Sequence, residues 1–239
     1  MIIDKGDKMA MTTKSSETLP LRISINPKAK RLILRVDERR REAVGVAPHK
    51  RMVPELMAFV EERSGWLKAQ LAKIPEPCAV RNGAVIRLRD QPCKLSLEGS
   101  GRRPQLIDGA PQILLLPGDP ETIGRRALRY LKSQARTDLA RSVEHHAKTL
   151  GIKTGRISVK DTRSRWGSCT AQGDLSFSWR LIMAPPHALD YVAAHECAHR
   201  LEMNHSSVFW QHVERCRPDW RQSRDWLKAH GTALHSVEF

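Results

Sequence analysis

The stretch Ala188-Leu-Asp-Tyr-Val-Ala-Ala-His-Glu-Cys-Ala-His-Arg-Leu201 contains the pattern His-Glu-x-x-His, with His195, Glu196 and His199. On a helix, residues four apart lie one above the other, so both imidazoles can reach one metal ion. Zinc hydrolases use this spacing, with the glutamate as the base that takes a proton from water. The pattern therefore predicts a zinc-dependent hydrolase in which His195 and His199 bind Zn²⁺ and Glu196 is catalytic.

A catalytic zinc site needs three protein ligands and one open position for water, so a third ligand is required. His205 follows His199 by six residues and is the predicted ligand, with Glu214 as the alternative. Metzincins share this histidine spacing but have glycine where this chain has Glu202, which argues against that class. Asn204 is then expected to make the turn in the left-handed conformation. Four other histidines lack such a spacing and are predicted at the surface: His145, His146, His187 and His212.

The composition is that of a folded globular protein. With 239 residues, of which 40% are hydrophobic, the chain has room for one large domain or two small ones. No apolar run of about 18 residues occurs, and charges interrupt the N-terminus too early for a secretory signal, so a soluble, cytoplasmic protein is expected. The five cysteines form no Cys-x-x-Cys pair, which argues against a disulfide framework and against a cysteine zinc site.

The chain carries a strong positive charge. Its 41 Lys and Arg residues against 26 Asp and Glu residues give a formal charge of +15. Such a charge attracts polyanions, which makes nucleic acid and nucleotides candidate partners. Aromatic residues make up only 5% of the chain, so a base-stacking platform for single strands is not indicated. The sequence does not specify an oligomeric state.

Periodicity divides the chain into three parts. Residues 1–20 have no apolar periodicity and are predicted to be a disordered leader. Residues 21–118 contain short alternating segments, which predict a β-rich region that begins with a small meander and includes one helix over residues 54–71. Residues 119–239 begin with a long helix over residues 120–150 and contain the His-Glu-x-x-His helix, which predicts a metallohydrolase domain.

Further elements are predicted within the C-terminal part. Residues 157–160 and 175–182 read as paired strands, and helices are expected over residues 207–216 and 219–230. The strand over residues 175–182 is hypothesised to present an edge that pairs with an extended peptide substrate. A basic stripe on the long helix is either a docking surface or a solvated face; it consists of Arg125, Arg129, Lys132 and Arg136.

The segment Arg163-Ser-Arg-Trp-Gly-Ser-Cys169 lies between the two strands. Turn chemistry explains Gly167, while Trp166 is expected to anchor the core and Cys169 to be a small buried residue. Cys197 follows Glu196 and points away from the histidine face, so it is expected to pack. Three arginines are candidates for stabilising negative charge in the transition state: Arg163, Arg165 and Arg180.

Several motifs occur together in this chain: Arg-x-Arg-Trp-Gly-Ser-Cys169, Trp179-Arg-Leu-Ile before Ala-Pro, Asp190-Tyr-Val, His-Glu-Cys-Ala-His and Asn204-His-Ser-x-x-Phe-Trp. Their combination resembles the YgjP-like metallopeptidases, relatives of the SprT and Spartan proteases. The resemblance covers about residues 157–230, and similar N-terminal segments extend it over most of the chain. Cys197 and Arg200 depart from the family's commoner residues and leave the expected ligands intact.

The resemblance implies an α+β fold. A zincin-like catalytic core, with the His-Glu-x-x-His helix packed on a small sheet, would follow a β-rich N-terminal region. It also implies Zn²⁺ as cofactor and a peptide or protein as substrate. The predicted function is accordingly a zinc metallopeptidase in which Glu196 activates a zinc-bound water.

Two other functions fit parts of the sequence. A metal-dependent phosphohydrolase acting on nucleotides is one alternative, because a basic chain attracts phosphates and metal-activated water also attacks phosphorus. A nucleic-acid-binding module with a structural metal is the other. The intact Glu196 argues against a purely structural metal site.

Overall fold

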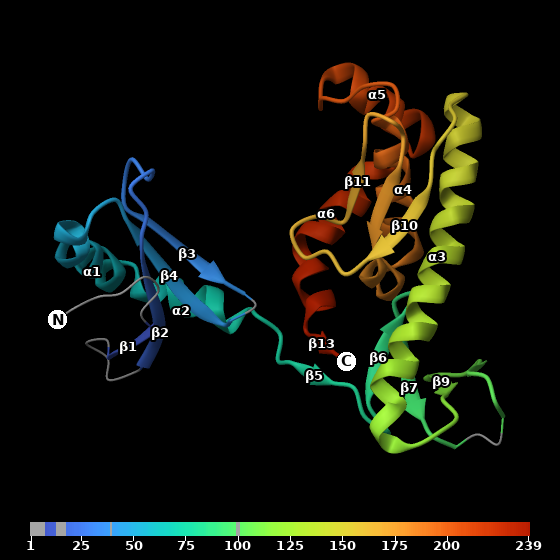
Figure 1. The fold of residues 1–239 in the computed structure, drawn as a ribbon, viewed down its shortest axis with the longest axis horizontal. Helices are drawn as coiled ribbons and strands as arrows, with labels where there is room; N and C mark the ends of the chain where they lie inside the picture. Colours follow the sequence, from blue (N-terminus) through green and yellow to red (C-terminus); the bar gives the residue numbers. More distant parts are fainter. Residues whose placement is uncertain (1–7, 13–17, 39, 99–100) are drawn as a thin grey trace. The chain divides into compact units, whose positions relative to one another are not determined.

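The computed structural model describes residues 8–12, 18–38, 40–98 and 101–239 (Figure 1). The chain forms two compact units, Met1–Glu76 (unit 1) and Pro77–Phe239 (unit 2). Each unit has its own cluster of buried apolar side chains. Helices and several small sheets occur together, which agrees with the predicted α+β class. Among the described residues, no helix is both long and apolar enough to span a membrane.

Unit 1 is a four-stranded sheet packed against two helices. The strands lie in the order β1-β2-β4-β3, in which two antiparallel hairpins meet through the parallel pair β2 and β4. This arrangement differs from the predicted meander. Its elements are β1 (Lys8–Thr12), β2 (Thr18–Ile25), β3 (Ile33–Asp37), β4 (Glu42–Ala47), the 3-10 helix η1 (Lys50–Met52), α1 (Val53–Glu62) and α2 (Ser64–Ala72).

Two sequence predictions for unit 1 differ from the structure. The single helix expected over residues 54–71 is two helices, because Arg63 leaves the helical conformation and Ser64-Gly65 follows it. Serine favours helix starts and glycine disfavours helix interiors, which is consistent with a break there. Residues 1–7 and 13–17 of the predicted leader lie outside the described residues, whereas Lys8–Thr12 within it forms β1.

Unit 2 begins with a second sheet that has the same topology as the first. Its order is β6-β7-β9-β8, again two antiparallel hairpins joined by a parallel central pair. A short strand near the start of the unit also pairs with the last strand of the chain. These elements are β5 (Cys78–Ala79), β6 (Val85–Leu88), β7 (Gln91–Ser96), β8 (Gln105–Ile107), β9 (Gln112–Leu115) and β13 (Val237–Glu238).

The remaining elements of unit 2 surround one long helix. Figure 1 shows α3 running beside α4 and β10, and all three contribute to the same apolar cluster. The elements are η2 (Pro120–Thr122), α3 (Ile123–Leu150), β10 (Ile157–Lys160), β11 (Gly167–Cys169), β12 (Leu175–Ser178), η3 (Trp179–Met183), α4 (Pro186–Ala198), α5 (Ser207–Cys216), α6 (Trp220–His230) and η4 (Gly231–His235).

The boundary between the units lies after Glu76, whereas the sequence predicted one N-terminal region reaching residue 118. The boundary lies earlier than predicted because the second sheet shares its buried core with α3. Leu95 and Leu114 from the second sheet are fully buried in the same cluster as Leu131 and Ala135 of α3. A sheet that shares its core with α3 belongs to the same unit as that helix, and this packing is not visible in local periodicity.

Helix α3 buries one face and exposes the basic stripe. Its buried positions recur at helical spacing, including Ala127, Leu131, Ala135 and Leu139. The four basic residues of the stripe are all exposed. The helix ends at Gly151, whose φ of 70° is the left-handed value that glycine adopts readily at a helix C-terminus.

The small sheet beside α4 has the order β10-β12-β11. The two predicted strands do pair, and they run parallel. The expectation that residues 175–182 present a free edge is wrong, because β12 lies between two partners and residues 179–183 form η3 instead. The free edges of this sheet therefore belong to β10 and β11.

Candidate metal centre

Three histidines come together at the end of α4, and we refer to them as the His triad: His195, His199 and His205. One ring nitrogen from each lies within 4.8 Å of the others. The ring centroids are 4.9 to 5.1 Å apart, close to an equilateral triangle. The Nε2 atoms of His195 and His205 face each other at 3.1 Å. The structure thus brings the three predicted ligands to one point.

The surroundings of His195 and His199 favour their neutral forms. Burial, followed by the nearby His199 and His205, lowers the pKa of His195 to about 3. Burial also lowers the pKa of His199, although a hydrogen bond to the Glu202 carbonyl opposes the shift. A neutral imidazole keeps a lone pair for a metal ion, whereas a protonated one does not.

The residues present fit a zinc ion. His199 Nδ1 lies 3.1 Å from the carbonyl oxygen of Glu202, which leaves its Nε2 free as a ligand. Neighbouring nitrogens around tetrahedral zinc are about 3.3 Å apart, because each lies about 2.0–2.1 Å from the ion. The separation of 3.1 Å between the two facing Nε2 atoms is close to this value. Three imidazoles without a thiol are also a donor set that catalytic zinc uses.

The turn that delivers His205 is built by side chains rather than by left-handed backbone. Asn204 is absent from the described non-glycine residues with positive φ, so the predicted left-handed turn is wrong. Its side-chain oxygen instead accepts a hydrogen bond from the Ser206 amide at 2.9 Å, and its amide donates to Glu202 at 2.6 Å. The Ser206 hydroxyl then accepts from the Phe209 amide and caps α5.

An aromatic floor supports the triad. The fully buried Phe209 ring lies 4.6 to 4.8 Å from all three histidine rings. Trp210 lies 6.0 Å from His205 and stacks on Trp220 at 4.2 Å. The motif Asn-His-Ser-x-x-Phe-Trp already signalled these positions, but sequence reasoning assigned them no function. Phe209 restricts where each imidazole can point.

Glu196 lies on the buried side of the site. It is 5% exposed, and burial raises the pKa of its carboxyl to about 8, while Arg165 opposes the shift. A Cβ atom at Gly167 on β11 would lie 2.5 Å from the Glu196 Oε1. Gly167 is therefore explained by close approach to Glu196, not by the predicted turn chemistry. The edge strand and the carboxylate are in direct contact because position 167 has no side chain.

Of the three candidate arginines, Arg163 and Arg165 are exposed and Arg180 is buried. Arg180 is buried and donates to Asp161 through Nε at 2.8 Å and to the carbonyls of Leu234 and Val237. Its donors are occupied by structural partners, so it is not available to a substrate. Arg165 remains a candidate because it is the cation whose charge reaches Glu196.

The neighbours of the motif pack as expected. Cys197 is fully buried with Sγ 3.9 Å from the Val143 carbonyl of α3, so the prediction that it packs is confirmed. Trp166 packs against the core cluster and stacks on His235 at 5.0 Å. Arg200 donates to the carbonyls of Lys153 and Ala171, which ties two loops to the end of α4.

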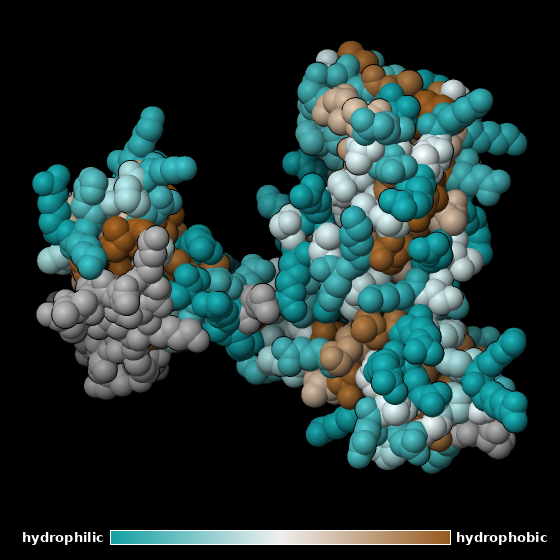
Figure 2. Space-filling model, in the orientation of Figure 1, coloured by the Kyte–Doolittle hydropathy of each residue, from teal (hydrophilic) through white to brown (hydrophobic). Residues whose placement is uncertain are grey.

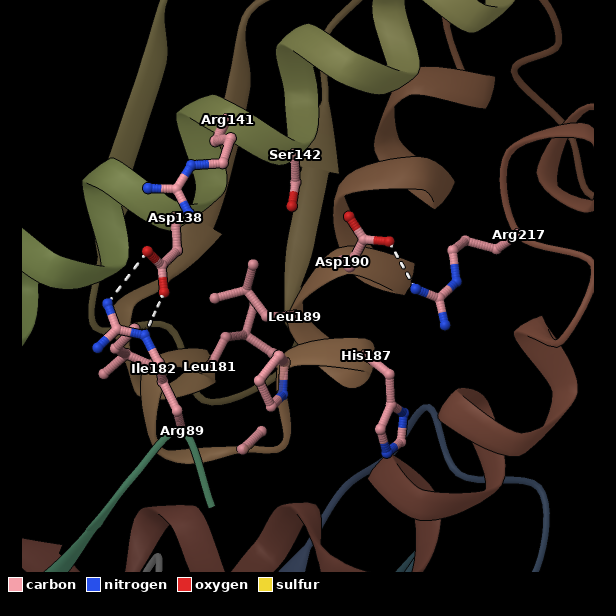
Figure 3. A pocket seen from close by; sticks show the side chains of 12 residues that line it. Arg89, Asp138, Arg141, Ser142, Leu181, Ile182, His187, Leu189, Asp190 and Arg217 are labelled. Carbon is pink, nitrogen blue, oxygen red and sulfur yellow. Dashed lines mark hydrogen bonds and ion pairs between the residues drawn. The ribbon is translucent and has the colours of Figure 1, made fainter. Parts of the chain in front are cut away.

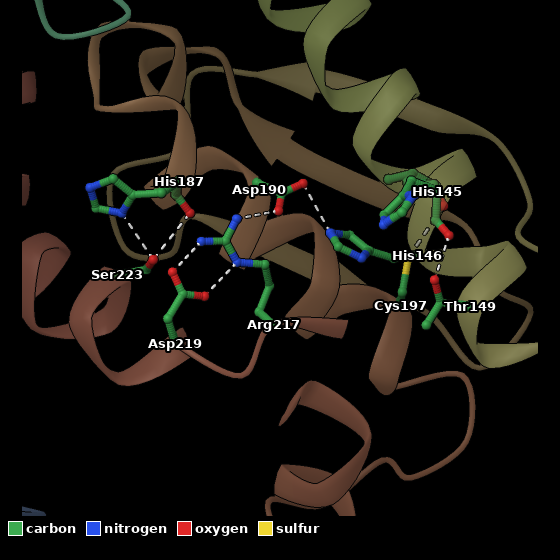
Figure 4. Close-up of polar contacts among 10 residues, drawn as sticks. His145, His146, Thr149, His187, Asp190, Cys197, Arg217, Asp219 and Ser223 are labelled. Atoms are coloured by element: carbon green, nitrogen blue, oxygen red, sulfur yellow. Dashed lines mark hydrogen bonds and ion pairs between the residues drawn. The ribbon is translucent and has the colours of Figure 1, made fainter. Parts of the chain in front are cut away.

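A polar network holds the other side of α4. The His146 Nε2 lies 3.0 Å from Asp190, and Arg217 donates to the same carboxylate at 2.8 Å (Figure 4). Burial raises the pKa of Asp190, but hydrogen bonds from His146 and Arg217 outweigh it and leave the pKa well below its usual range. His146 has no exposed surface, so its predicted surface position is wrong.

A cavity of about 300 Å³ lies between this network and the turn that joins β6 and β7. Figure 3 shows two ion pairs on opposite sides of it, Asp190 with Arg217 and Arg89 with Asp138. Arg89 donates to both oxygens of Asp138, at 2.7 and 3.1 Å. The cavity contains no member of the His triad, and both carboxylates have partners within the protein.

The alternative ligand lies elsewhere. Glu214 on α5 forms an exposed ion pair with Arg221 at 3.4 Å and is not in the group of potential metal ligands found among the described residues. His187 contacts Ser223 at 3.0 Å. Neither residue adds a ligand to the triad.

Comparison with known proteins gives one family. The model of the YgjP-like metallopeptidase domain matches residues 30–230, a range that includes the His triad. A search of the curated proteins found no match. Among solved structures, the chain is similar to the metallopeptidase zymogen of Pyrococcus abyssi abylysin, with 19% identity and a TM-score of 0.36. That similarity covers 42% of this chain and 99% of the other.

Proposed function

Because the chain belongs to the YgjP-like metallopeptidase family, we propose that it is a zinc-dependent peptidase with a zincin-like core made of α4 and the β10-β12-β11 sheet. His195, His199 and His205 hold the metal, and Glu196 is the general base. The observation that carries the proposal is the convergence of the three imidazoles of the His triad beside the buried carboxyl group of Glu196. When bound, zinc supplies Lewis acidity, which makes water more acidic and a carbonyl more electrophilic.

The His triad, Phe209 and Glu196 have separate roles in the proposed mechanism. The triad nitrogens fix the metal, and Phe209 fixes the rings. Glu196 accepts a proton from the attacking water at its carboxylate and then passes this proton to the leaving amine. The position of Glu196 against Gly167 keeps the carboxylate close to β11 throughout.

The substrate is expected to lie along β11. Within the described residues this strand pairs with β12 on one side and with no strand on the other, so its second edge offers backbone groups to an extended peptide. The close approach of Gly167 to Glu196 supports this path, because a peptide along β11 would then pass beside the proposed base. Arg165 is the proposed stabiliser of negative charge that develops on the substrate carbonyl oxygen.

The other two functions have less support. The family match favours peptide hydrolysis over phosphate hydrolysis, and no contact in the described residues favours a nucleotide at the triad. A structural metal would not need a buried carboxylate beside it. We therefore retain a phosphohydrolase and a nucleic-acid-binding module only as outcomes of the test.

The test combines metal analysis with a matched pair of glutamate variants. Protein purified without added metal is analysed for zinc, and release of products from casein and from nucleoside triphosphates is compared for wild type, Glu196→Gln and Glu214→Gln. We expect one zinc per chain in all three proteins. Cleavage of casein should fall by about 100- to 10,000-fold in Glu196→Gln alone, the usual contribution of a general base.

Other outcomes would lead elsewhere. Phosphate release that depends on Glu196, without cleavage of casein, would favour the phosphohydrolase. The nucleic-acid-binding module would be favoured if the protein contains zinc, has no activity that depends on Glu196 and binds DNA in a salt-sensitive way. Absence of zinc, with no activity after zinc is added, would refute the metal centre.

A further inference from the structure

Unit 1 contains a groove of about 510 Å³ between strand β3 and the helices α1 and α2. Two large hydrophobic side chains stay exposed there, Trp66 at 48% and Ile33 at 39%. Figure 2 shows hydrophobic residues reaching the surface of this unit beside strongly hydrophilic ones. The groove is lined mainly by Arg31, Leu32, Ile33, Phe59, Arg63 and Trp66.

The wall of the groove is an edge strand. In the order β1-β2-β4-β3, β3 has β4 on one side and no strand on the other among the described residues. An edge strand turns unpaired N–H and C=O groups outward, which is the template that another extended chain uses for pairing. Alternate side chains of an added strand would then face the apolar wall.

The charge of the groove is positive. Arg31 and Arg63 line it, and no acidic residue does. Arg63 lies 3.4 Å from Glu62, but both side chains are more than half exposed, so this pair contributes little. Arg63 also lies 6.0 Å above the Phe59 ring. The groove therefore complements a ligand that has apolar groups and negative charges close together.

The lining favours a peptide over a nucleic acid. Single-strand binders stack successive bases on a row of aromatic rings. Here only Phe59 and Trp66 are aromatic, while Ile33 and Leu34 on the strand are aliphatic. An edge strand offers main-chain hydrogen bonds to a peptide, whereas a nucleic acid has no matching backbone.

We propose that this groove binds an extended protein segment in which apolar and acidic side chains alternate, and that the segment adds to β3 as a further strand. In unit 1 the site would recruit protein substrates for the centre in unit 2. The recruiting role rests on the proposed peptidase function, whereas binding to the groove does not.

The test uses the full chain with Glu196→Gln, so that the probe is not cleaved. Binding of the fluorescein-labelled peptide Glu-Val-Glu-Phe-Glu-Val-Glu-Val is followed by fluorescence anisotropy. We expect Trp66→Ala and the double variant Arg31→Glu/Arg63→Glu each to weaken binding by about tenfold, as loss of a central interface residue does. The control Lys50→Glu/Arg51→Glu makes the same charge change at exposed positions of η1 and should stay within about twofold.

A second probe tests the strand pairing. The same peptide with every other backbone nitrogen methylated cannot donate its hydrogen bonds, and it should bind about tenfold more weakly. Circular dichroism of each variant is required to match the parent before binding is compared.

Several results would overturn the proposal. The proposal fails if the peptide does not bind saturably. It also fails if the groove variants bind the peptide as well as the control variant does, or if methylation of the peptide does not weaken binding. Tighter binding of an oligothymidine of the same charge, lost in the groove variants, would replace the peptide with a single-stranded nucleic acid. Because binding is measured without cleavage, a failure of the peptidase assay leaves this result unaffected, and the two failures are distinguishable.

Discussion

His146 on α3, which is fully buried, and His195 on α4, which is half-buried, differ in their partners. The His146 Nε2 lies 3.0 Å from a carboxylate, Asp190, which Arg217 also contacts. The His195 Nε2 lies 3.1 Å from another imidazole, His205, and has no acidic partner in the described part of the chain. Both contacts are short, but only the first joins a donor to a charged acceptor.

The difference supports a structural role for the cluster around His146 and the metal-binding role proposed for the His triad. A histidine beside a carboxylate and an arginine is satisfied within the protein and stabilises the fold. Three imidazoles that face one point cannot all pair their ring nitrogens with one another. Each nitrogen that points to the centre of the triad needs a proton donor or a cation there. A metal ion at that point would satisfy all three rings, so the comparison supports the proposal that the His triad is a binding site.

The strongest test of this difference is His205→Ala. Loss of one of three ligands should lower zinc affinity by more than about 100-fold, since even changes outside the ligand shell cost about 10- to 100-fold. Casein cleavage should disappear, and stability in the presence of a chelator should stay the same. Competition with a fluorescent chelator measures the affinity. His230→Ala, an exposed histidine on α6, is the control; a similar loss there would contradict the assignment.

Asp190→Asn tests the other cluster. Removing the charge should cost about 2–4 kcal/mol of unfolding free energy, because His146 and Arg217 lose a partly buried partner. Urea unfolding with chelator present measures this, while zinc affinity should stay near wild type. Asp219→Asn removes the exposed partner of the same arginine and should cost at most about 1 kcal/mol. Equal costs for the two variants would contradict the central role of Asp190.

The same network predicts a pH dependence. The folded state lowers the pKa of Asp190 below its unfolded value, so its stabilising contribution is present above about pH 4. It is lost as the pH falls through the folded pKa, where the carboxyl takes up a proton. The stability difference between wild type and Asp190→Asn should therefore shrink as the pH falls from about 4 to about 2. A difference that stays constant over this range would show that the charge of Asp190 is not involved.

A smaller effect is expected at Gly167. An added Cβ would meet Glu196 at 2.5 to 2.8 Å, so Gly167→Ala must displace the carboxylate or β11. Peptidase activity should fall by about 10- to 100-fold, because a misplacement of about 1 Å costs this much. Zinc content should not change. Gly65→Ala, where nothing lies within 4 Å, is the matched control and should keep full activity.

The smallest effect is expected for Glu214→Gln. Both side chains of its ion pair with Arg221 are exposed, so the free energy of unfolding should change by less than about 1 kcal/mol. Zinc affinity should stay within about twofold of wild type. A large loss of zinc would make Glu214 a ligand after all and would weaken the distinction between the two clusters.

Sequence and structure agree best where interactions are local. The helices over residues 120–150 and 207–216 were predicted from spacing, and the structure has helices there. Strand roles were harder to predict. The edges of the sheet beside α4 belong to β10 and β11 instead of residues 175–182, since strand order depends on pairing between distant segments. The burial of His146 was missed because its partner Asp190 is far away in the sequence.

The sequence by itself determined that His195 and His199 share one side of a helix with Glu196 between them, because four-residue spacing is a local property of the α-helix. It also determined the family, through motifs that are read without coordinates. Only the tertiary structure decided why position 167 is glycine, which histidine is structural and which strand has a free edge. Each of these depends on segments that meet only after folding, and no local pattern records which segments will meet.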